Sequence, residues 1–255
     1  MINHYINSRV ILKAENLSYR YPDKTLAIDN ISFTLREGQK LAVIGPNGSG
    51  KSTLLTLLNG VRRGEGYLEV FGYPVKKENL EKIKKWVGLI FQNPDDQLFC
   101  PTIFEDVAFG PLNLGLFPDE VARRVKAALH NVGLVGYEER SSFHLSYGER
   151  KLASIATVLA MHPRLLAMDE PTSNLDLAHR RKIIRWIQES TQSFIITTHD
   201  LDMALQTCSR VILLNRGKIV RDGLAEEILL DEKLLEENDL ELPLSKQNIW
   251  KQTSL

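Results

Sequence analysis

The clearest chemical pattern in the chain is a run of glycines that ends in a lysine and two hydroxyl residues. The run has the form G-x-x-x-x-G-K-S and consists of Gly45, Pro46, Asn47, Gly48, Ser49, Gly50, Lys51, Ser52 and Thr53. Glycines let the backbone bend and approach an anion, so that successive N–H groups can point at a phosphate. Lys51 can then reach the β- and γ-phosphates of a nucleotide, and the Ser52 hydroxyl can ligate Mg²⁺.

The residues on either side of this run supply the context that a phosphate-binding loop needs. Residues 40–44 form a short apolar run of strand length, and paired leucines give residues 51–58 a helical pattern. Asn59 and Gly60 then supply a stop signal. An ordinary glycine-rich turn is the alternative, but it requires neither a buried strand before it nor a helix after it. We therefore interpret residues 45–53 as a phosphate-binding loop that opens a helix.

Two adjacent acids follow a second apolar run. Residues 165–168 are Leu-Leu-Ala-Met, and Asp169 and Glu170 come directly after them. A buried strand that ends in carboxylates delivers them to the edge where α/β sheets bind ligands. Asp169 is positioned to hold Mg²⁺, and Glu170 to orient and deprotonate the water that attacks the γ-phosphate. A strand that ends in a polar turn is the alternative, and the loop upstream favours the functional interpretation.

The pentapeptide 145–149, Leu-Ser-Tyr-Gly-Glu, precedes a helical pattern of apolar residues. Ser146 and Glu149 satisfy the S-x-x-E capping box, so an ordinary helix start explains their spacing. It does not explain Gly148, because a glycine in the first turn destabilises a helix. A glycine there indicates that something approaches the backbone closely. A capped helix start is also a second anion site, and since the chain has one phosphate-binding loop, that phosphate would come from another copy.

The elements that must position these residues begin with an all-strand region. The first strands follow one another with no helix between residues 10 and 35, which predicts an antiparallel sheet beside the main core. These strands are expected at residues 10–21, 31–35 and 66–71. A charged helix is expected near residues 78–85, and an apolar strand over residues 86–91. Residues 93–159 are mostly helical by pattern, with the clearest period at residues 119–131.

Strands and helices alternate in the rest of the chain. Buried strands are expected at residues 165–168, 194–198 and 211–214, and helices at residues 177–189 and 201–208. This alternation predicts a parallel sheet with helices on both faces. The acidic, leucine-containing residues 224–240 are expected to be helical.

Composition excludes several classes of protein. The 255 residues include 32 Lys+Arg and 32 Asp+Glu, and this zero net charge argues against a general binder of nucleic acid or anionic membranes. Cys100 and Cys208 are the two cysteines, so a disulfide framework or a zinc site is not expected and a reducing cytosol fits. No apolar stretch has the length of about 18 residues that a membrane span needs. Any membrane role is therefore expected to come through a partner.

The loop at residues 45–53, the pentapeptide and the acid-tipped strand occur in one order, and His199 follows a later strand. This set resembles the ATP-binding cassette (ABC) ATPases from about residue 10 to residue 223, and residues 224–255 would be a C-terminal extension. The resemblance implies an α/β fold of the P-loop NTPase (RecA-like) type with a mostly parallel core sheet. It also implies an N-terminal antiparallel β-subdomain and an inserted α-helical subdomain at about residues 93–160.

The resemblance also assigns roles to single residues. The pentapeptide looks like the family signature, usually Leu-Ser-Gly-Gly-Gln, with Tyr147 and Glu149 as departures. Ser146 and Gly148 match the pair that touches the γ-phosphate of a partner chain's ATP. Gln92 matches the glutamine that senses Mg²⁺ and the attacking water, so the implied metal-binding set is Ser52, Gln92 and Asp169. A polar strand end is the alternative for Gln92.

Three further residues match family positions. Residues 173–176, Ser-Asn-Leu-Asp, resemble the D-loop, so Asp176 is assigned to the nucleotide site, although capping of the next helix is compatible. His199 matches the switch histidine that contacts the γ-phosphate, so the implied catalytic residues are Glu170, His199 and Lys51. Tyr21 precedes a turn where the family stacks an aromatic ring on adenine, and Tyr19 competes with it.

Short stretches indicate a subfamily. Residues 93–98 and 109–116, together with the signature variant, resemble the ATPases of energy-coupling-factor importers, most closely the cobalt/nickel type. This implies ATP and Mg²⁺ as the ligands, and a second ATPase chain, either identical or a close paralogue, as one partner. It further implies integral membrane transport subunits as the other partners, no nucleic acid, and a peripheral position on the cytoplasmic face of the cell membrane.

Three other functions within the family compete with importer energisation. A soluble ABC ATPase that serves iron–sulfur cluster assembly remains open, and the proteins that co-purify would decide between them. A ribosome- or nucleic-acid-acting cassette would carry a second cassette or a long coiled coil, and no heptad run separates Lys51 from Leu145. A non-hydrolysing regulator would be expected to lack Glu170 or His199, and both are present.

Overall fold

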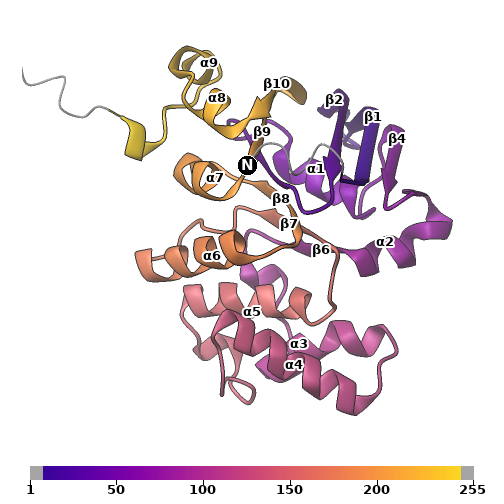
Figure 1. Cartoon of the computed structure of the whole chain (residues 1–255). Helices are drawn as coiled ribbons and strands as arrows, with labels where there is room; N and C mark the ends of the chain where they lie inside the picture. The colour runs from indigo at the N-terminus through magenta and orange to yellow at the C-terminus, as the bar shows by residue number, and fades with distance from the viewer. Residues whose placement is uncertain (1–7, 248–255) are drawn as a thin grey trace, which may run out of the picture.

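Two β-sheets and a set of helices make up the computed structural model, which describes residues 8–247 (Figure 1). The larger sheet has six strands in the order β10-β9-β3-β8-β7-β6. Its strands are β3 (Lys40–Ile44), β6 (Val87–Ile90), β7 (Leu165–Asp169), β8 (Ser193–Thr197), β9 (Arg210–Asn215) and β10 (Lys218–Leu224). The smaller sheet has four strands in the order β2-β1-β4-β5. Its strands are β1 (Val10–Arg20), β2 (Leu26–Arg36), β4 (Glu65–Val70) and β5 (Tyr73–Pro74).

The larger sheet is parallel except at one edge. β3 pairs in parallel with β8 and β9, and β7 pairs in parallel with β6 and β8. β10 pairs antiparallel with β9 and covers that edge. The predicted mostly parallel core is therefore confirmed. β10 was not predicted, because most of its side chains are exposed and the strand carries no apolar run.

The smaller sheet is antiparallel throughout, which confirms the predicted N-terminal β-subdomain. β2 begins at Leu26, five residues before the predicted start. Its pairing with β1 shifts register near Asn30, which has a φ of +51°. This irregularity breaks the two-residue alternation, so the sequence pattern reveals only the second half of the strand.

Helices cover both faces of the larger sheet. They are α1 (Lys51–Leu58), α2 (Leu80–Trp86), α3 (Ile103–Asn113), α4 (Pro118–Val132), α5 (Tyr147–Leu159), α6 (Leu177–Glu189), α7 (Leu201–Thr207), α8 (Ala225–Leu229) and α9 (Glu232–Glu236). Short 3₁₀ turns occur at Lys77–Asn79, Pro94–Asp96, Ser142–His144 and Leu244–Lys246. Between β6 and β7 the chain is helical, and α3, α4 and α5 form the inserted helical subdomain at the lower end of Figure 1.

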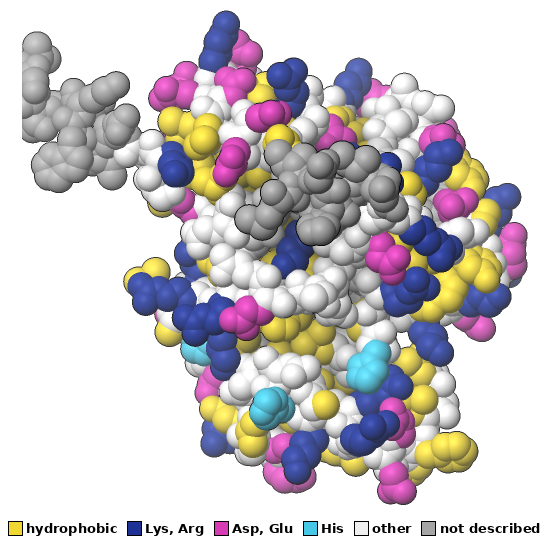
Figure 2. All heavy atoms as spheres, viewed as in Figure 1, with side chains coloured by type: hydrophobic (Ala, Val, Ile, Leu, Met, Phe, Trp, Pro, Cys, Tyr) yellow, Lys and Arg dark blue, Asp and Glu magenta, His cyan; other side chains and the backbone are white. Residues whose placement is uncertain are grey.

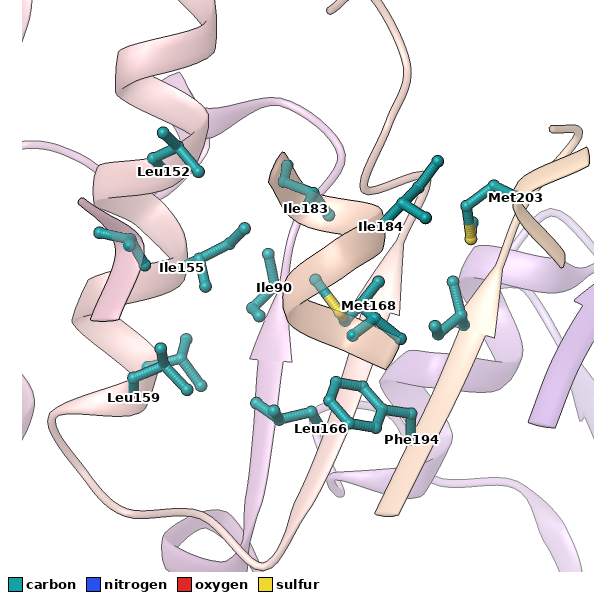
Figure 3. Packing of buried hydrophobic residues seen from close by; sticks show 14 of the residues in the cluster. Ile90, Leu152, Ile155, Leu159, Leu166, Met168, Ile183, Ile184, Phe194 and Met203 are labelled. Atoms are coloured by element: carbon teal, nitrogen blue, oxygen red, sulfur yellow. The ribbon is translucent and has the colours of Figure 1, made fainter. Parts of the chain in front are cut away.

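The strands of the core have apolar side chains on both faces, as expected for a parallel sheet between two layers. On β7, Leu165 and Ala167 pack with the smaller sheet and α1, whereas Leu166 and Met168 face the opposite way. Figure 3 shows Leu166 and Met168 beside Ile90, among side chains of α5 and α6. The alternating side chains thus join the sheet to helices on one side and to the second sheet on the other.

Two further predicted elements differ from the structure. Trp86 is the last residue of α2, so the strand that follows starts at Val87. The predicted single helix over residues 224–240 is two short helices, because the Asp231 side chain accepts the N–H of Leu234 and starts α9. Residues 248–255 of the C-terminal extension lie outside the described residues.

The charged surface, the helix lengths and the cysteines are the remaining features of the fold. Figure 2 shows acidic and basic side chains interspersed over the face in view. Within residues 8–247, no helix has both the length and the apolar character needed to span a bilayer. Cys100 and Cys208 are free thiols.

Candidate active site

The phosphate-binding loop connects β3 to α1, as predicted. Gly45 and Gly50 adopt positive φ angles of 151° and 107°. A Cβ at Gly45 would lie 1.9 Å from the Leu214 carbonyl oxygen, and one at Gly50 would lie 2.3 Å from the Ala27 carbonyl oxygen. These two glycines are therefore required by neighbouring protein backbone, not only by an approaching anion. Gly48 has a positive φ of 77°, which favours glycine, and the open space around it leaves room for a ligand to approach.

Lys51 is buried inside this loop. Its ammonium donates to the carbonyl oxygens of Gly45 at 2.8 Å and Pro46 at 3.0 Å. Burial lowers the pKa of Lys51, and the negative charges of Glu170 and Asp169 act in the opposite direction. Ser49 Oγ is also buried and has no hydrogen-bond partner within residues 8–247. A buried hydroxyl without a partner and a lysine whose two acceptors are uncharged carbonyls fit an anion site.

Asp169 and Glu170 lie beside the loop because of the strand order. β7, β8 and β3 are neighbours and run parallel, so their carboxyl ends meet at one edge of the sheet. Asp169 Oδ1 accepts a hydrogen bond from Thr197 Oγ1 at 2.5 Å. Glu170 has a φ of +43°, and its N–H donates to the Thr197 carbonyl. The end of β8 therefore orients both acids.

Glu170 and His199 are in direct contact. Glu170 Oε2 lies 2.8 Å from His199 Nδ1 and accepts the backbone N–H of His199 at 3.1 Å. The Glu170 side chain is 8% exposed, whereas that of His199 is 60% exposed. A buried carboxylate is thus held at the sheet edge by a histidine that faces solvent. This contact was not predicted from the sequence, which assigned His199 to a phosphate.

A cavity of 710 Å³ lies over the loop and the sheet edge. Its lining includes twelve predicted site residues: Tyr21, Gly45, Pro46, Asn47, Gly48, Gly50, Lys51, Ser52, Thr53, Gln92, Glu170 and His199. It also includes Thr25, Leu26, Ala27, Asp239 and Leu240, which were not predicted. The first three follow the Tyr21 turn and could have been inferred from it. Asp239 and Leu240 carry no local signal, because the chain brings them there only by folding back.

Tyr21 lies at the cavity, and Tyr19 is not among the described lining residues. The Tyr21 hydroxyl is 2.8 Å from Thr53 Oγ1, and the Arg62 guanidinium lies 4.8 Å from the centre of the Tyr21 ring. Tyr19 Oη instead accepts a hydrogen bond from Arg62. The geometry favours Tyr21 over Tyr19 for the base end of the site, and stacking on adenine remains a prediction.

Gln92 lines the cavity just after β6. Its backbone carbonyl accepts the Lys151 ammonium at 2.9 Å and the Tyr147 hydroxyl at 3.4 Å. The loop that carries Gln92 is therefore attached to α5. No cluster of three or more His, Cys, Asp or Glu side chains that could hold a metal ion occurs in the described part of the chain. The predicted magnesium-binding set of Ser52, Gln92 and Asp169 contains only one residue of these types, and it stays a prediction.

Ser146 and Asp176 lie outside the lining of the cavity and cap helices. Ser146 Oγ accepts the Glu149 N–H, and Glu149 Oε2 accepts the Ser146 N–H at 2.8 Å, so the predicted capping box is present. Asp176 Oδ1 accepts the N–H groups of Ala178 and His179 at the start of α6. These capping roles do not exclude contact with a nucleotide of another chain.

Gly148 is also outside the cavity lining. A Cβ at Gly148 would lie 2.5 Å from Cγ of His179, whose Nδ1 is 2.7 Å from Asp176 Oδ2. The group that approaches this backbone closely is thus a ring of the same chain. The contact between Gly148 and His179 could not be found from the sequence, because 31 positions separate the two residues.

Comparisons with known proteins agree with this geometry. A family model described as ABC transporter matches residues 28–173. The energy-coupling factor transporter ATP-binding protein EcfA of Methanocaldococcus jannaschii is 42% identical over 239 residues, which cover 91% of this chain and 86% of that protein. The family match includes the loop at residues 45–53, the signature pentapeptide and the acid-tipped strand.

Two solved structures share the fold. CbiO1 from Clostridium perfringens, described as part of the ABC transporter complex cbiONQ, has a TM-score of 0.79 at 33% identity and covers 89% of this chain and 94% of its own. A dimeric ATP-binding cassette, MJ0796, in a post-hydrolysis state bound to ADP and Pi, has a TM-score of 0.75 at 25% identity and covers 84% and 99%. The chain belongs to the ABC transporter family, whose ATP-binding proteins couple ATP hydrolysis to transport, and it is close to EcfA and CbiO.

Proposed function

We propose that this chain is the ATP-hydrolysing subunit of an energy-coupling-factor importer for cobalt, nickel or a vitamin. The main observation in favour of ATP hydrolysis is the contact between Glu170 and His199 at the edge of the cavity that Lys51 lines. Similarity to EcfA and to CbiO1 supports the importer type. The short stretches at residues 93–98 and 109–116 support the same subfamily.

The loop is suited to the phosphate tail of ATP. Phosphate oxygens would replace the Gly45 and Pro46 carbonyls as acceptors for Lys51, and they would give the buried Ser49 hydroxyl a partner. Ser52, Gln92 and Asp169 offer a hydroxyl, an amide oxygen and a carboxylate, which are oxygen donors of the kind that Mg²⁺ takes. When bound, the ion neutralises charge on the phosphates.

Glu170 is suited to act as the general base. It would accept a proton from a water molecule whose oxygen bonds to the γ-phosphorus, while the bond from that phosphorus to the bridging oxygen of ADP breaks. The contact with His199 fixes the carboxylate, and the exposed part of the imidazole ring can face the γ-phosphate. Asp169 is not among the described lining residues of the cavity, and Thr197 holds its carboxylate.

A second ATPase chain would complete each site. Ser146 and Gly148 do not line the cavity of their own chain, although they match the signature residues that contact a γ-phosphate. Two chains in head-to-tail arrangement would bring Ser146 of one to the loop of the other. The dimeric state of the MJ0796 cassette supports a pair of chains.

An apolar surface near α3 would contact the membrane subunits. Phe99 and Phe109 are 66% and 49% exposed, and their rings lie edge to face with centroids 5.0 Å apart. Leu112, one turn further along α3, is also exposed. Exposed apolar patches often mark protein interfaces. Through this surface the helical subdomain would transmit its movement to an integral membrane partner. The same contact would hold the chain at the cytoplasmic face of the membrane.

Substitution of the proposed base tests the mechanism. Glu170→Gln should lower the rate of ATP hydrolysis by a factor of about 10²–10⁴, because it removes the proton acceptor without changing the size of the side chain. The variant should accumulate as an ATP-bound dimer in size-exclusion chromatography with ATP and Mg²⁺. Hydrolysis at the wild-type rate would refute the assignment.

Co-purification tests the importer assignment. The full chain, isolated in mild detergent from cells that contain its natural partners, should bring integral membrane proteins with it. Recovery of cytosolic scaffold proteins instead would support the alternative, a soluble ABC ATPase that serves iron–sulfur cluster assembly.

A further inference from the structure

Lys151 is a fully buried lysine that does not line the cavity. It lies in the second turn of α5, and its exposed fraction is 0%. Its ammonium donates to the backbone carbonyls of Phe91 at 2.7 Å and Gln92 at 2.9 Å. Removing a charged group from water is costly unless the interior offers good partners. Packing alone therefore does not explain a lysine at this position.

Other side chains strengthen the contact between α5 and the Gln92 loop. The Tyr147 hydroxyl, one turn before Lys151 on the same face, also donates to the Gln92 carbonyl. The Gln97 side chain reaches back and donates to the Ser154 carbonyl and to Thr157 Oγ1, both at 2.7 Å. The loop and the helix are thus joined along three successive turns.

We propose that Lys151 is a positioning residue that fixes Gln92, at the γ-phosphate end of this chain's cavity, to the helix that offers Ser146 to the second chain's nucleotide. The inference rests on the proposed head-to-tail pair. Because Lys151 and Ser146 belong to one helix, a shift of the Gln92 backbone on nucleotide binding moves Ser146 as well. Occupation of one site is thereby linked to closure of the other.

The charge of Lys151 is consistent with this position. Burial lowers the pKa of Lys151 to about 8, and the negative charges of Asp169 and Glu170 act in the opposite direction. The two carbonyl acceptors of Lys151 hold its ammonium between α5 and the loop after β6. An uncharged side chain of similar shape would fill the space but would leave the Phe91 and Gln92 carbonyls without these bonds.

Lys151→Met tests the link, with Lys126→Met on the exposed face of α4 as the matched control. Each substitution is made in the full-length chain and in the Glu170→Gln variant. The affinity for ADP, measured by calorimetry on the monomer, should stay within about twofold, since no cavity residue changes. The ATP concentration at which half of the Glu170→Gln protein is dimeric should rise about tenfold.

Steady-state kinetics give the second readout. In the otherwise wild-type chain, Lys151→Met should lower the Hill coefficient for ATP from near two toward one, and kcat should fall about tenfold. Lys151→Gln, which retains N–H donors on a chain one bond shorter, should recover part of both effects. If the Lys151→Met variant does not fold, Lys151→Gln is used in its place in every assay.

The outcomes separate this inference from the proposed function. If Glu170→Gln dimerises with ATP and Lys151→Met changes neither the ATP midpoint nor the Hill coefficient, Lys151 does not couple the sites and the proposed function stands. If Lys151→Met weakens ADP binding as much as it weakens dimer formation, its role is structural and the inference is wrong. If Glu170→Gln never dimerises, the head-to-tail pair fails, and the link through Lys151 fails with it.

Discussion

Glu170 combines three features at the scale of a single residue. It is buried, its backbone has a positive φ, and its carboxylate contacts His199 through both the ring and the backbone N–H. Strained backbone and buried carboxylates are common at functional sites, and they persist only where the surrounding fold maintains them. The fold maintains this one through the end of β8, where Thr197 accepts the Glu170 N–H.

Removal of the His199 ring should therefore affect catalysis more than binding. His199→Ala should lower kcat for ATP hydrolysis about 10²-fold or more, because the general base loses the group that orients it and the γ-phosphate loses a contact. The affinity for ADP should stay within about twofold, since Lys51 and the loop are unchanged. His130→Ala, on the exposed face of α4, serves as the control. An ADP affinity that falls in parallel with kcat would show that His199 supports the loop instead.

Asp200, next in the chain, has a structural role that pH can reveal. Its two carboxylate oxygens accept bonds from Arg180 of α6 at 2.7 and 2.9 Å, and one of them accepts the Met203 N–H. Burial by itself raises the pKa of Asp200, but the bonds from Arg180 and Met203 outweigh it, and the pKa lies below its ordinary value. The carboxylate thus stabilises the junction of α6 and α7.

Asp200→Asn should lower the free energy of unfolding by about 2 kcal/mol near pH 7. A depressed folded-state pKa gives stability that is present above the unfolded pKa of about 3.9 and is lost as pH falls through the folded-state pKa. The difference between wild type and variant should therefore shrink below about pH 4. Urea unfolding at several pH values measures it, with Asp119→Asn as an exposed control. A difference that widened in acid would contradict the assignment.

At the scale of elements, the start of α5 is held by its own chain at two places. Lys151 and Tyr147 attach it to the loop after β6, and Gly148 lies against the His179 ring at the start of α6. The signature helix is therefore in contact with the loop that carries Gln92 and with His179 of α6, whose ring is bound to Asp176. Tyr147 stands where the family pattern has a glycine. Its hydroxyl donates to the Gln92 carbonyl, a contact that a glycine could not make.

Gly148 is explained either by the His179 ring of the same chain or by the nucleotide of the second chain. The variants Gly148→Ala and His179→Ala separate these two explanations. Gly148→Ala alone should slow ATP hydrolysis about tenfold, because its Cβ would meet the His179 ring and displace the start of α5. His179→Ala alone should have a small effect. If the ring is the obstacle, the double variant should recover most of the activity, a non-additive result expected of residues in contact.

A double variant as slow as Gly148→Ala would point to the second chain's nucleotide as the group that needs the glycine. Thermal unfolding of all three variants shows whether the loss is one of folding. Wild-type activity in Gly148→Ala would contradict both explanations.

At the scale of the whole molecule, the sequence predicts what local patterns encode. Strong apolar runs predicted β3, β7, β8 and β9. The acids that follow one of these runs predicted the sheet edge at which Asp169 lies beside the loop. β10 has an exposed pattern and could not be recognised. Contacts that depend on folding, such as Asp239 at the cavity and Lys151 at Gln92, have no signature in sequence spacing, because distant segments meet only in three dimensions.

The apolar surface at Phe99 and Phe109 makes the last prediction, which concerns assembly. Phe99→Ser with Phe109→Ser should abolish co-purification of integral membrane proteins in mild detergent, because the substitutions remove two exposed aromatic rings from the proposed interface. ATP hydrolysis by the isolated chain should stay within about twofold, since neither residue lines the cavity. Phe117→Ser is the matched control, because Phe117 is 83% exposed and lies just beyond α3. Retention of the membrane proteins by the double variant, or their loss in Phe117→Ser alone, would place the interface elsewhere on the helical subdomain.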